Sequence, residues 1–222
     1  MNKRIITATF LMAMSSLAGF AQRQFDNLDR GLIAVKSNGG MYCSWRINAD
    51  EYYATTYDLY RDGVKVNDQP LTVSNFTDPN GTLESQYTVK AVHAGQASAD
   101  SKKGLSLANG WLEVKKPKRI SNDGKTDISN QYEPNDATIG DVDGDGEMEL
   151  ITKQLFIGQD PNNTSQADFA RIEVQKLDGT LLWWIDCGPN MWDFQQNEIN
   201  IMAYDWDGDG KAECVARLQD GS

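Results

Sequence analysis

Residues 141–149 read DVDGDGEME, and residues 205–213 read DWDGDGKAE. Both stretches follow the pattern D-x-D-G-D-G-x-x-E. Glycine reaches backbone conformations with positive φ, which lets a short loop fold several carboxylates around one ion. Ca²⁺ takes about six to eight oxygen ligands, and closely spaced carboxylates without a cation repel one another. The two copies therefore predict two calcium sites, and acidic surface turns that bind no metal are the alternative.

Each predicted site takes its ligands from its own loop. The first site would use four carboxylates and one carbonyl: Asp141, Asp143, Asp145 and Glu149, with the carbonyl of Glu147. The second site would use the matching residues: Asp205, Asp207, Asp209 and Glu213, with the carbonyl of Lys211. Because each loop supplies its own oxygens, little of the coordination sphere is left for a substrate, and we expect both ions to be structural.

An EF-hand also begins with D-x-D-x-D-G, but it needs an acidic residue at the twelfth loop position. Thr152 and Ala216 occupy that position here, and the acid comes at the ninth position instead. Strand-like runs flank both loops, at residues 137–140, 150–152, 199–204 and 214–216. The loops are therefore predicted to lie in turns between strands.

The two strand–loop–strand units form an internal repeat. Residues 171–186 lie between them and read as a hairpin with Asp178-Gly179 at its tip. One unit thus holds about four strands, as does a blade of a β-propeller, and a propeller needs ~4–8 blades. Residues 113–222 provide one blade and part of a second. We therefore expect the N-terminal part of a longer protein, and a complete small protein with an unpaired sheet edge is the alternative.

Strand and turn signals also alternate over residues 25–112, and the mature chain shows no helical periodicity of useful length. Two strands are predicted within residues 31–47, and a hairpin is predicted around Asp62-Gly63. Residues 86–92 form a further alternating run. With Trp45 at the centre, this spacing predicts a small β-sandwich. The expected fold class is all-β, a sandwich followed by the first blades of a propeller.

The composition excludes several classes of protein. The chain has 222 residues with 21 Lys+Arg against 32 Asp+Glu, a net charge of −11. Nucleic-acid binders usually carry a basic face, so that class is disfavoured. His93 is the single histidine, which excludes histidine-rich metal sites and nearly every histidine-based triad within this chain. We expect His93 to be a surface residue at a strand end.

The N-terminus reads as a secretory signal peptide. Lys3 and Arg4 precede an uncharged run over residues 5–20, and small residues around Ala21 fit a cleavage site. The run is short for a bilayer span of ~20 residues, and a membrane anchor is the alternative. We expect residues 1–21 to be removed and the mature chain to be secreted or periplasmic, with no membrane span.

Two features are predicted to be structural. Cys43, Cys187 and Cys214 are expected to be buried small side chains, with a Cys187–Cys214 disulfide as the alternative. The basic run at residues 115–119 is expected to be a linker or an exposed edge.

The tryptophans near the second loop include candidate sugar-binding residues. Trp183 and Trp184 are adjacent in a predicted strand, so their side chains must face opposite sides. Trp192 lies in a predicted loop and is the better candidate for stacking on a sugar ring.

Several stretches carry a resemblance to known families. Trp45, the run YDLY at 57–60 and the run YTVKAV at 87–92 resemble a fibronectin type III domain, in which Tyr87 would be the corner tyrosine. The mature chain as a whole resembles the rhamnogalacturonan lyases of polysaccharide lyase family eleven. The matching stretches are residues 27–35, 44–46, 60–67, 141–149, 176–183 and 204–213. Acidic loops alone occur in other FG-GAP-like propellers, whereas LDRG at 28–31 and YRDG at 60–63 make this resemblance more specific.

The resemblance implies an eight-bladed propeller that cleaves the rhamnose–galacturonic acid backbone of pectin by β-elimination. A cation pairs with the uronate carboxylate, a base removes the C5 proton, and the C4 oxygen leaves. The implied partner is an acidic plant cell-wall polysaccharide. We expect a monomer that binds Ca²⁺ and no nucleic acid.

The sequence departs from the family pattern in two stretches. Residues 195–200 lack the histidine expected before the second acidic loop, and residues 154–161 replace an expected Trp-Asp-Pro stretch. No position matches a catalytic base, so no catalytic residue is assigned. The alternative function is a non-catalytic, calcium-stabilised propeller for carbohydrate binding or adhesion.

Overall fold

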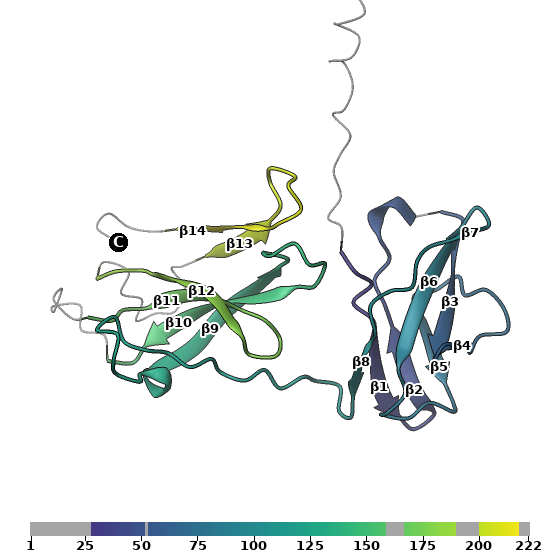
Figure 1. Cartoon of the computed structure of the whole chain (residues 1–222), viewed down its shortest axis with the longest axis horizontal. Helices are drawn as coiled ribbons and strands as arrows, with labels where there is room; N and C mark the ends of the chain where they lie inside the picture. Colours follow the sequence, from purple (N-terminus) through teal and green to yellow (C-terminus); the bar gives the residue numbers. More distant parts are fainter. Residues whose placement is uncertain (1–27, 52, 159–166, 190–199, 218–222) are drawn as a thin grey trace, which may run out of the picture.

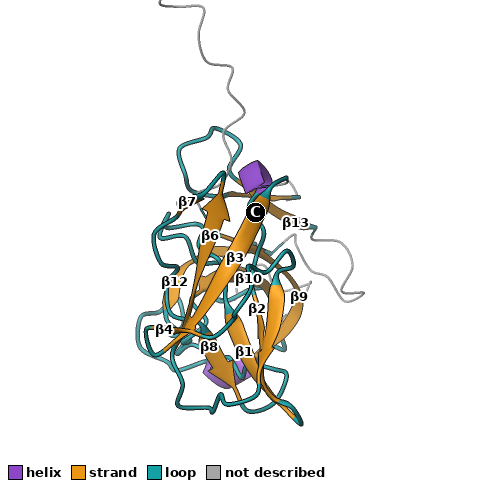
Figure 2. Ribbon diagram, turned by 90° about the vertical axis from the view of Figure 1, so that its right-hand side faces the viewer, coloured by secondary structure: helices purple, strands orange, loops and turns teal. Residues whose placement is uncertain are grey.

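The computed structural model describes residues 28–51, 53–158, 167–189 and 200–217, and its regular structure is almost entirely strand (Figures 1 and 2). The helical elements of these residues are two short 3-10 turns, η1 (Ala49–Glu51) and η2 (Ser129–Gln131). The expected all-β class is confirmed. In this part of the chain no helix has the length and apolar character needed to cross a membrane. Residues 1–21, the predicted signal peptide, lie outside it.

Two four-stranded sheets form the N-terminal unit, in the orders β5-β2-β1-β8 and β4-β3-β6-β7. Their strands are β1 (Ile33–Ser37), β2 (Gly40–Ser44), β3 (Thr55–Arg61), β4 (Val64–Lys65), β5 (Asn75–Asp78), β6 (Tyr87–His93), β7 (Gln96–Ala97) and β8 (Leu105–Leu107). The two predicted hairpins are present, β1–β2 and β3–β4. At the second turn Asp62 and Gly63 both have positive φ, which suits an Asp-Gly hairpin turn.

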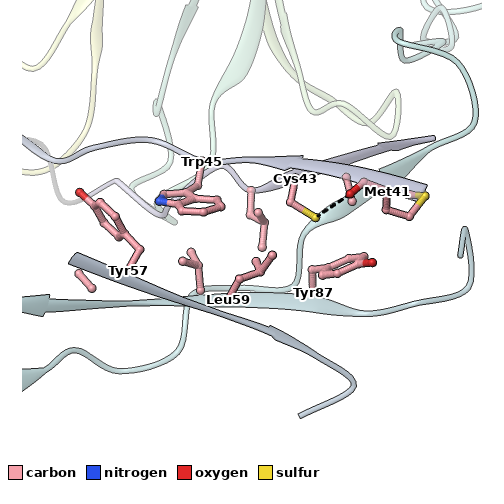
Figure 3. Close-up of a cluster of buried hydrophobic side chains, with 10 residues drawn as sticks. Met41, Cys43, Trp45, Tyr57, Leu59 and Tyr87 are labelled. Atoms are coloured by element: carbon pink, nitrogen blue, oxygen red, sulfur yellow. Dashed lines mark hydrogen bonds between the residues drawn. The ribbon is translucent and has the colours of Figure 1, made fainter. Parts of the chain in front are cut away.

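Side chains from both sheets meet in one apolar core (Figure 3). Met41 and Cys43 of β2 point toward Leu59 of β3 and Tyr87 of β6, and all four are almost fully buried. Buried and partly exposed residues alternate along β3 and β6, as in strands packed on one face. The core therefore lies between the two sheets.

The predicted places of two single residues in this unit are confirmed. Trp45 is buried and packs edge-on against Tyr57, with ring centroids 5.6 Å apart. His93 is exposed at the end of β6, where its Nδ1 lies 2.8 Å from Thr55 Oγ1.

Tyr87 connects the core to an ion pair between the buried Asp78 and the partly exposed Arg61. Its hydroxyl donates to the Asp78 carboxylate at 2.8 Å, and Nη1 of Arg61 lies 2.8 and 2.6 Å from the two Asp78 oxygens. Burial, with the neighbouring Asp78, raises the pKa of Tyr87 well above its usual range. A Cβ at Gly81 would collide with the Tyr87 hydroxyl, so this close approach requires glycine. The Tyr87 hydroxyl is thus bonded to a side chain that lies 9 residues earlier in the sequence.

A third sheet, whose strands are all antiparallel, follows an extended segment. This segment is drawn in teal along the lower part of Figure 1. The strand order of the sheet is β12-β11-β10-β9. The strands are β9 (Tyr132–Gly140), β10 (Glu149–Phe156), β11 (Arg171–Gln175) and β12 (Leu181–Asp186). A further pair, β13 (Ile201–Tyr204) and β14 (Glu213–Ala216), lies beside it (Figure 1). The acidic loops join β9 to β10 and β13 to β14, between strands as predicted.

The central strands of this sheet, β10 and β11, are buried on both faces because different segments cover them. Ile151, Ile172 and Val174 point to an apolar face, and residues of β13 and β14 pack against it. Alternate residues point to the opposite, polar face. Arg171 and Glu173 lie there and are almost fully buried. All five residues of β11 are therefore buried.

The prediction that residues 115–119 form a linker or exposed edge is wrong for Arg119. This side chain is 2% exposed, and its Nε and Nη2 each lie 2.7 Å from a carboxylate oxygen of Glu173. The guanidinium also lies 5.5 Å from the ring centroid of Tyr132. The basic composition of this run predicts exposure to solvent. A bidentate carboxylate partner 54 residues away instead compensates for burial of the charge.

Replacing Arg119 by methionine is expected to destabilise the chain by about 3–5 kcal/mol, because Glu173 would remain buried without its partner. Lys118→Met is the matched control, since the Lys118 side chain is 73% exposed and lies 3.9 Å from Asp127. Its expected effect is within about 0.5 kcal/mol. Urea unfolding followed by tryptophan fluorescence measures both variants. Equal midpoints for R119M and K118M would contradict a stabilising role for the ion pair.

Candidate metal centre

The two acidic loops are closed by the same set of hydrogen bonds, which run from backbone N–H groups to side-chain carboxylates. In each loop the first aspartate, Asp141 or Asp205, accepts from three N–H groups at 2.6–3.1 Å. The donors are Gly144, Asp145 and Gly146 in the first loop, and Gly208, Asp209 and Gly210 in the second. In each loop the final glutamate accepts from the residue after the first aspartate at 2.9 Å. The sequence repeat is therefore a repeat of conformation.

Of the predicted carboxylate ligands, all four converge in the second loop and three of four converge in the first. In the second loop one oxygen from each of four acids lies within 4.8 Å of the others: Asp205, Asp207, Asp209 and Glu213. In the first loop the same holds for three: Asp141, Asp143 and Glu149. Oxygens bound at about 2.4 Å to one Ca²⁺ can be at most ~4.8 Å apart. These hard oxygen donors therefore fit the predicted ion.

The residues predicted to supply carbonyl ligands hold equivalent places. The N–H of Glu147 donates to Asp145 Oδ1 at 2.8 Å, and the N–H of Lys211 donates to Asp209 Oδ1 at 2.9 Å. The role of their carbonyls as fifth ligands stays a prediction.

Asp145 differs from its counterpart Asp209, because lysines contact it. Nζ of Lys176, next to the β11–β12 turn, lies 2.6 Å from Asp143 Oδ2 and 2.9 Å from Asp145 Oδ2. Nζ of Lys102, from the N-terminal unit, lies 3.7 Å from Asp145 Oδ1. Asp145 is outside the converging set of the first loop. Lysine cations thus compensate part of the charge of this loop.

The electrostatic setting follows from these contacts. The hydrogen bond that Lys176 donates lowers the pKa of Asp145, and the hydrogen bonds that Asp143 and Asp145 accept from Lys176 raise the pKa of the lysine. Burial raises the pKa of Glu149, with the N–H of Val142 acting in the opposite direction. Glu149 is 1% exposed, so its ionised form needs a nearby positive charge. A bound cation would supply that charge.

The second loop packs directly against the first. The N–H of Ala212 donates to the carbonyl of Asp141 at 2.7 Å. A Cβ at Gly140 would lie 3.0 Å from the Cβ atoms of Ala203 and Ala212, so a small residue is needed there. A cavity of 150 Å³ between the loops is also lined by Leu28 of the N-terminal unit. The two predicted ion sites are therefore neighbours.

The other sequence candidates take separate places. Trp183 packs against the apolar face and Trp184 is 38% exposed, with its ring 3.9 Å from the Arg171 guanidinium carbon, so the predicted opposite orientation is confirmed. Trp192, the proposed sugar-stacking residue, lies outside the described residues. All three cysteines are free thiols; Cys43 and Cys187 are buried as predicted, whereas Cys214 is only partly buried. Burial raises the pKa values of Cys43 and Cys187 to about 12.

Sequence reasoning missed the two lysines of the first loop. In the sequence Lys176 belongs to the predicted hairpin at residues 171–186, and no pattern marks Lys102. The one local signal is that Lys176 lies two residues before the Asp178-Gly179 turn. Lys102 lies 43 residues before Asp145, and no sequence pattern joins them.

Two family models match this chain. Residues 23–106 match the family described as rhamnogalacturonan I lyases beta-sheet domain. Residues 111–222 match rhamnogalacturonan lyase family 11, C-terminal domain.

Curated relatives and a solved structure are similar over most of this chain. The rhamnogalacturonan endolyase YesW of Bacillus subtilis (strain 168) is 38% identical over 235 residues, covering 100% of this chain and 37% of the relative. The rhamnogalacturonan exolyase YesX of the same organism is 40% identical over 211 residues, covering 90% and 33%. The crystal structure of YesX superposes with a TM-score of 0.69 at 38% identity, covering 89% of this chain and 33% of that one.

The chain thus spans about a third of the length of the curated relatives it matches. Their similarity includes both the N-terminal unit and the acidic-loop unit, and one family model alone covers half of the chain. The chain belongs to rhamnogalacturonan lyase family 11.

Proposed function

We propose that this chain is part of an exported lyase that cleaves the rhamnogalacturonan backbone by β-elimination. The observation that carries the proposal is the family match over residues 111–222, together with relatives named as rhamnogalacturonan endolyase and exolyase. The substrate is an acidic polysaccharide. The reaction removes the C5 proton of a galacturonate residue, expels the C4 oxygen and leaves a C4–C5 double bond. No catalytic base is assigned to this chain.

The acidic loops are proposed to bind two structural Ca²⁺ ions. The support is that the predicted carboxylates converge in both loops on the same scaffold of backbone hydrogen bonds. Bound ions would supply positive charge to buried carboxylates such as Glu149. The ions would thus fix the turns that connect consecutive strands, and we assign them no step in the reaction.

The sheet of β9–β12 is proposed to be the first blade of an eight-bladed propeller, with β13 and β14 beginning the second. Residue equivalence across the repeat supports this. Ile151 is fully buried under β13 and β14, whereas its repeat counterpart Val215 is 47% exposed. An exposed apolar face at the second unit is what stacked repeats produce before the next unit is added.

The N-terminal unit is proposed to be a fibronectin type III-like domain over residues 25–112, with the propeller occupying residues 113–222. The support is the division of its strands: β1, β2 and β5 share one sheet, and β3, β4, β6 and β7 share the other. This distribution fits an Ig-like sandwich in which the connections β2–β3, β4–β5 and β5–β6 cross between the sheets.

We propose that the chain is exported, as its N-terminal sequence indicates. Lys3, Arg4 and the apolar run that follows support a signal peptide. Edman sequencing or intact mass of the protein from its native host is expected to give Gln22 as the first residue. A protein that retains Met1 would contradict the cleavage.

Isothermal titration of the metal-free chain with Ca²⁺ is expected to give two bound ions. At a free concentration about 100-fold above the Kd, each ion would add about 2.7 kcal/mol to the free energy of unfolding. Asp205→Asn is expected to remove one ion. Asp100→Asn removes the same charge at an exposed position outside the loops and is expected to keep both. The calcium sites would be contradicted if the titration gave no heat of binding and Ca²⁺ did not raise the unfolding temperature.

The lyase proposal is tested on the native polypeptide that carries this chain, incubated with rhamnogalacturonan and Ca²⁺. We expect unsaturated uronic acid ends, which absorb ultraviolet light, because β-elimination creates a conjugated double bond. Homogalacturonan is the control substrate and is expected to give no such signal. Binding of rhamnogalacturonan without any unsaturated product would instead favour a non-catalytic carbohydrate-binding protein.

A further inference from the structure

The first acidic loop makes its shortest contacts with the N-terminal unit through atoms that are not among its predicted metal ligands, and Lys102 Nζ also lies 3.7 Å from Oδ1 of the predicted ligand Asp145. The N–H of Asp29 donates to the carbonyl of Gly146 at 2.9 Å. Nζ of Lys102 donates to the carbonyl of Asp145 at 2.7 Å. The same Nζ lies 3.3 Å from Glu147 Oε1. The loop therefore offers carboxylates to an ion and backbone carbonyls to the sandwich.

The sandwich side of this contact is tightly held. Asp29 Oδ1 accepts from the N–H of Lys102 at 2.9 Å, so the two contact residues are bonded to each other. Arg46 donates to the carbonyl of Asp29 at 2.5 Å, and the N–H of Gly31 donates to Asp29 Oδ2 at 3.2 Å. Asp29 and Lys102 thus form one unit, which we name the latch.

The positions of the loop carbonyls depend on how the loop carboxylates are held together. Asp141 is 8% exposed and Glu149 is 1% exposed, and their oxygens lie within 4.8 Å of each other and of Asp143. Carboxylates this close repel one another unless a cation compensates for them. We therefore expect that without a cation the turn at residues 144–146 would lose its closed shape, and that the carbonyls bound by the latch would move with it.

The second loop provides an internal comparison. It has the same backbone hydrogen bonds, yet within the described residues no hydrogen bond or ion pair joins it to the sandwich. Its Asp207 corresponds to Asp143 of the first loop, and both belong to converging acid sets. The second loop does contact the first through the bond from Ala212 to the Asp141 carbonyl, but none of its carboxylates contacts Asp29 or Lys102, so we expect its ion to leave the latch unaffected.

We infer that the first acidic loop is a calcium-dependent latch site, where a bound ion fixes the loop shape that Asp29 and Lys102 of the sandwich recognise. This inference rests on the calcium sites of the proposed function. Occupation of the first loop then sets whether the sandwich stays docked on the sheet of β9–β12, and occupation of the second loop does not.

Hydrogen–deuterium exchange on the full chain tests the latch. The amide of Asp29 donates across the contact, so its exchange reports docking directly. Saturating Ca²⁺ is expected to slow this exchange roughly ten- to a hundredfold relative to chelator, in the range of couplings between sites. Amides of β3 and β6, such as those of Leu59 and Val89, serve as the internal control for folding of the sandwich.

Two matched pairs of variants separate the latch from general stability. Asp143→Asn is expected to abolish the calcium-dependent protection of Asp29, and Asp207→Asn to retain it, although each removes one bound ion. Lys102→Met is expected to abolish the protection while two ions still bind. Lys103→Met removes an exposed neighbouring charge and is expected to change neither.

The outcomes distinguish this inference from the calcium proposal. If two ions bind and Asp29 exchange does not change, the latch is wrong and the calcium sites stand. If no ion binds, both are wrong. If D143N and D207N abolish the protection equally, the first loop has no special role and the latch is also wrong.

Discussion

Mutual repulsion among the carboxylates at residues 141–149 must be overcome before the C-terminal half of this chain can take its observed form. Two kinds of group oppose this repulsion, backbone N–H groups and lysine side chains. Backbone N–H groups of the glycine-containing turn bond to Asp141, with Gly144 and Gly146 at φ 80° and 87°. Lys176 arrives from the β11–β12 hairpin and Lys102 from the sandwich. Strands β9 and β10 begin to pair at this loop, so the register of the sheet and the docking of the sandwich share one electrostatic origin.

The sheet that starts there is held differently on its two faces. The apolar face gains from removing side chains such as Ile151 and Ile172 from water, a contribution that depends on area and tolerates variation in the partner. The polar face depends on directional ion pairs. Arg119 pairs with Glu173 and Arg171 pairs with Asp168, at nitrogen–oxygen distances of 2.7 and 2.8 Å. Such pairs add little net stability but are costly to break. The polar face therefore selects one position for the segment that covers it.

What the sequence predicts well is local. Asp62-Gly63 and Asp178-Gly179 identify two hairpins, because Asp62, Gly63 and Gly179 adopt the positive φ that tight turns need. The acidic loops are recognised because all their donors and acceptors lie within nine consecutive positions. Arg119 and Lys102 were misread or missed because each is defined by a partner far along the chain. A charged side chain carries no local mark of whether its partner will be water or a buried carboxylate.

The same distinction bears on what makes this chain a member of its family. Acidic loops of this pattern follow from the chemistry of oxygen ligands and small residues, so by themselves they say little about the family. The run Leu-Asp-Arg-Gly at 28–31 is more specific, and the structure gives it three connected tasks. Leu28 lines the cavity between the loops, Asp29 binds the first loop, and Arg30 pairs with Glu51 under Tyr57. A change at any one of these positions would disturb its neighbours, because they share a single stretch of backbone. The more specific part of the sequence is therefore the part that attaches the sandwich to the acidic loop.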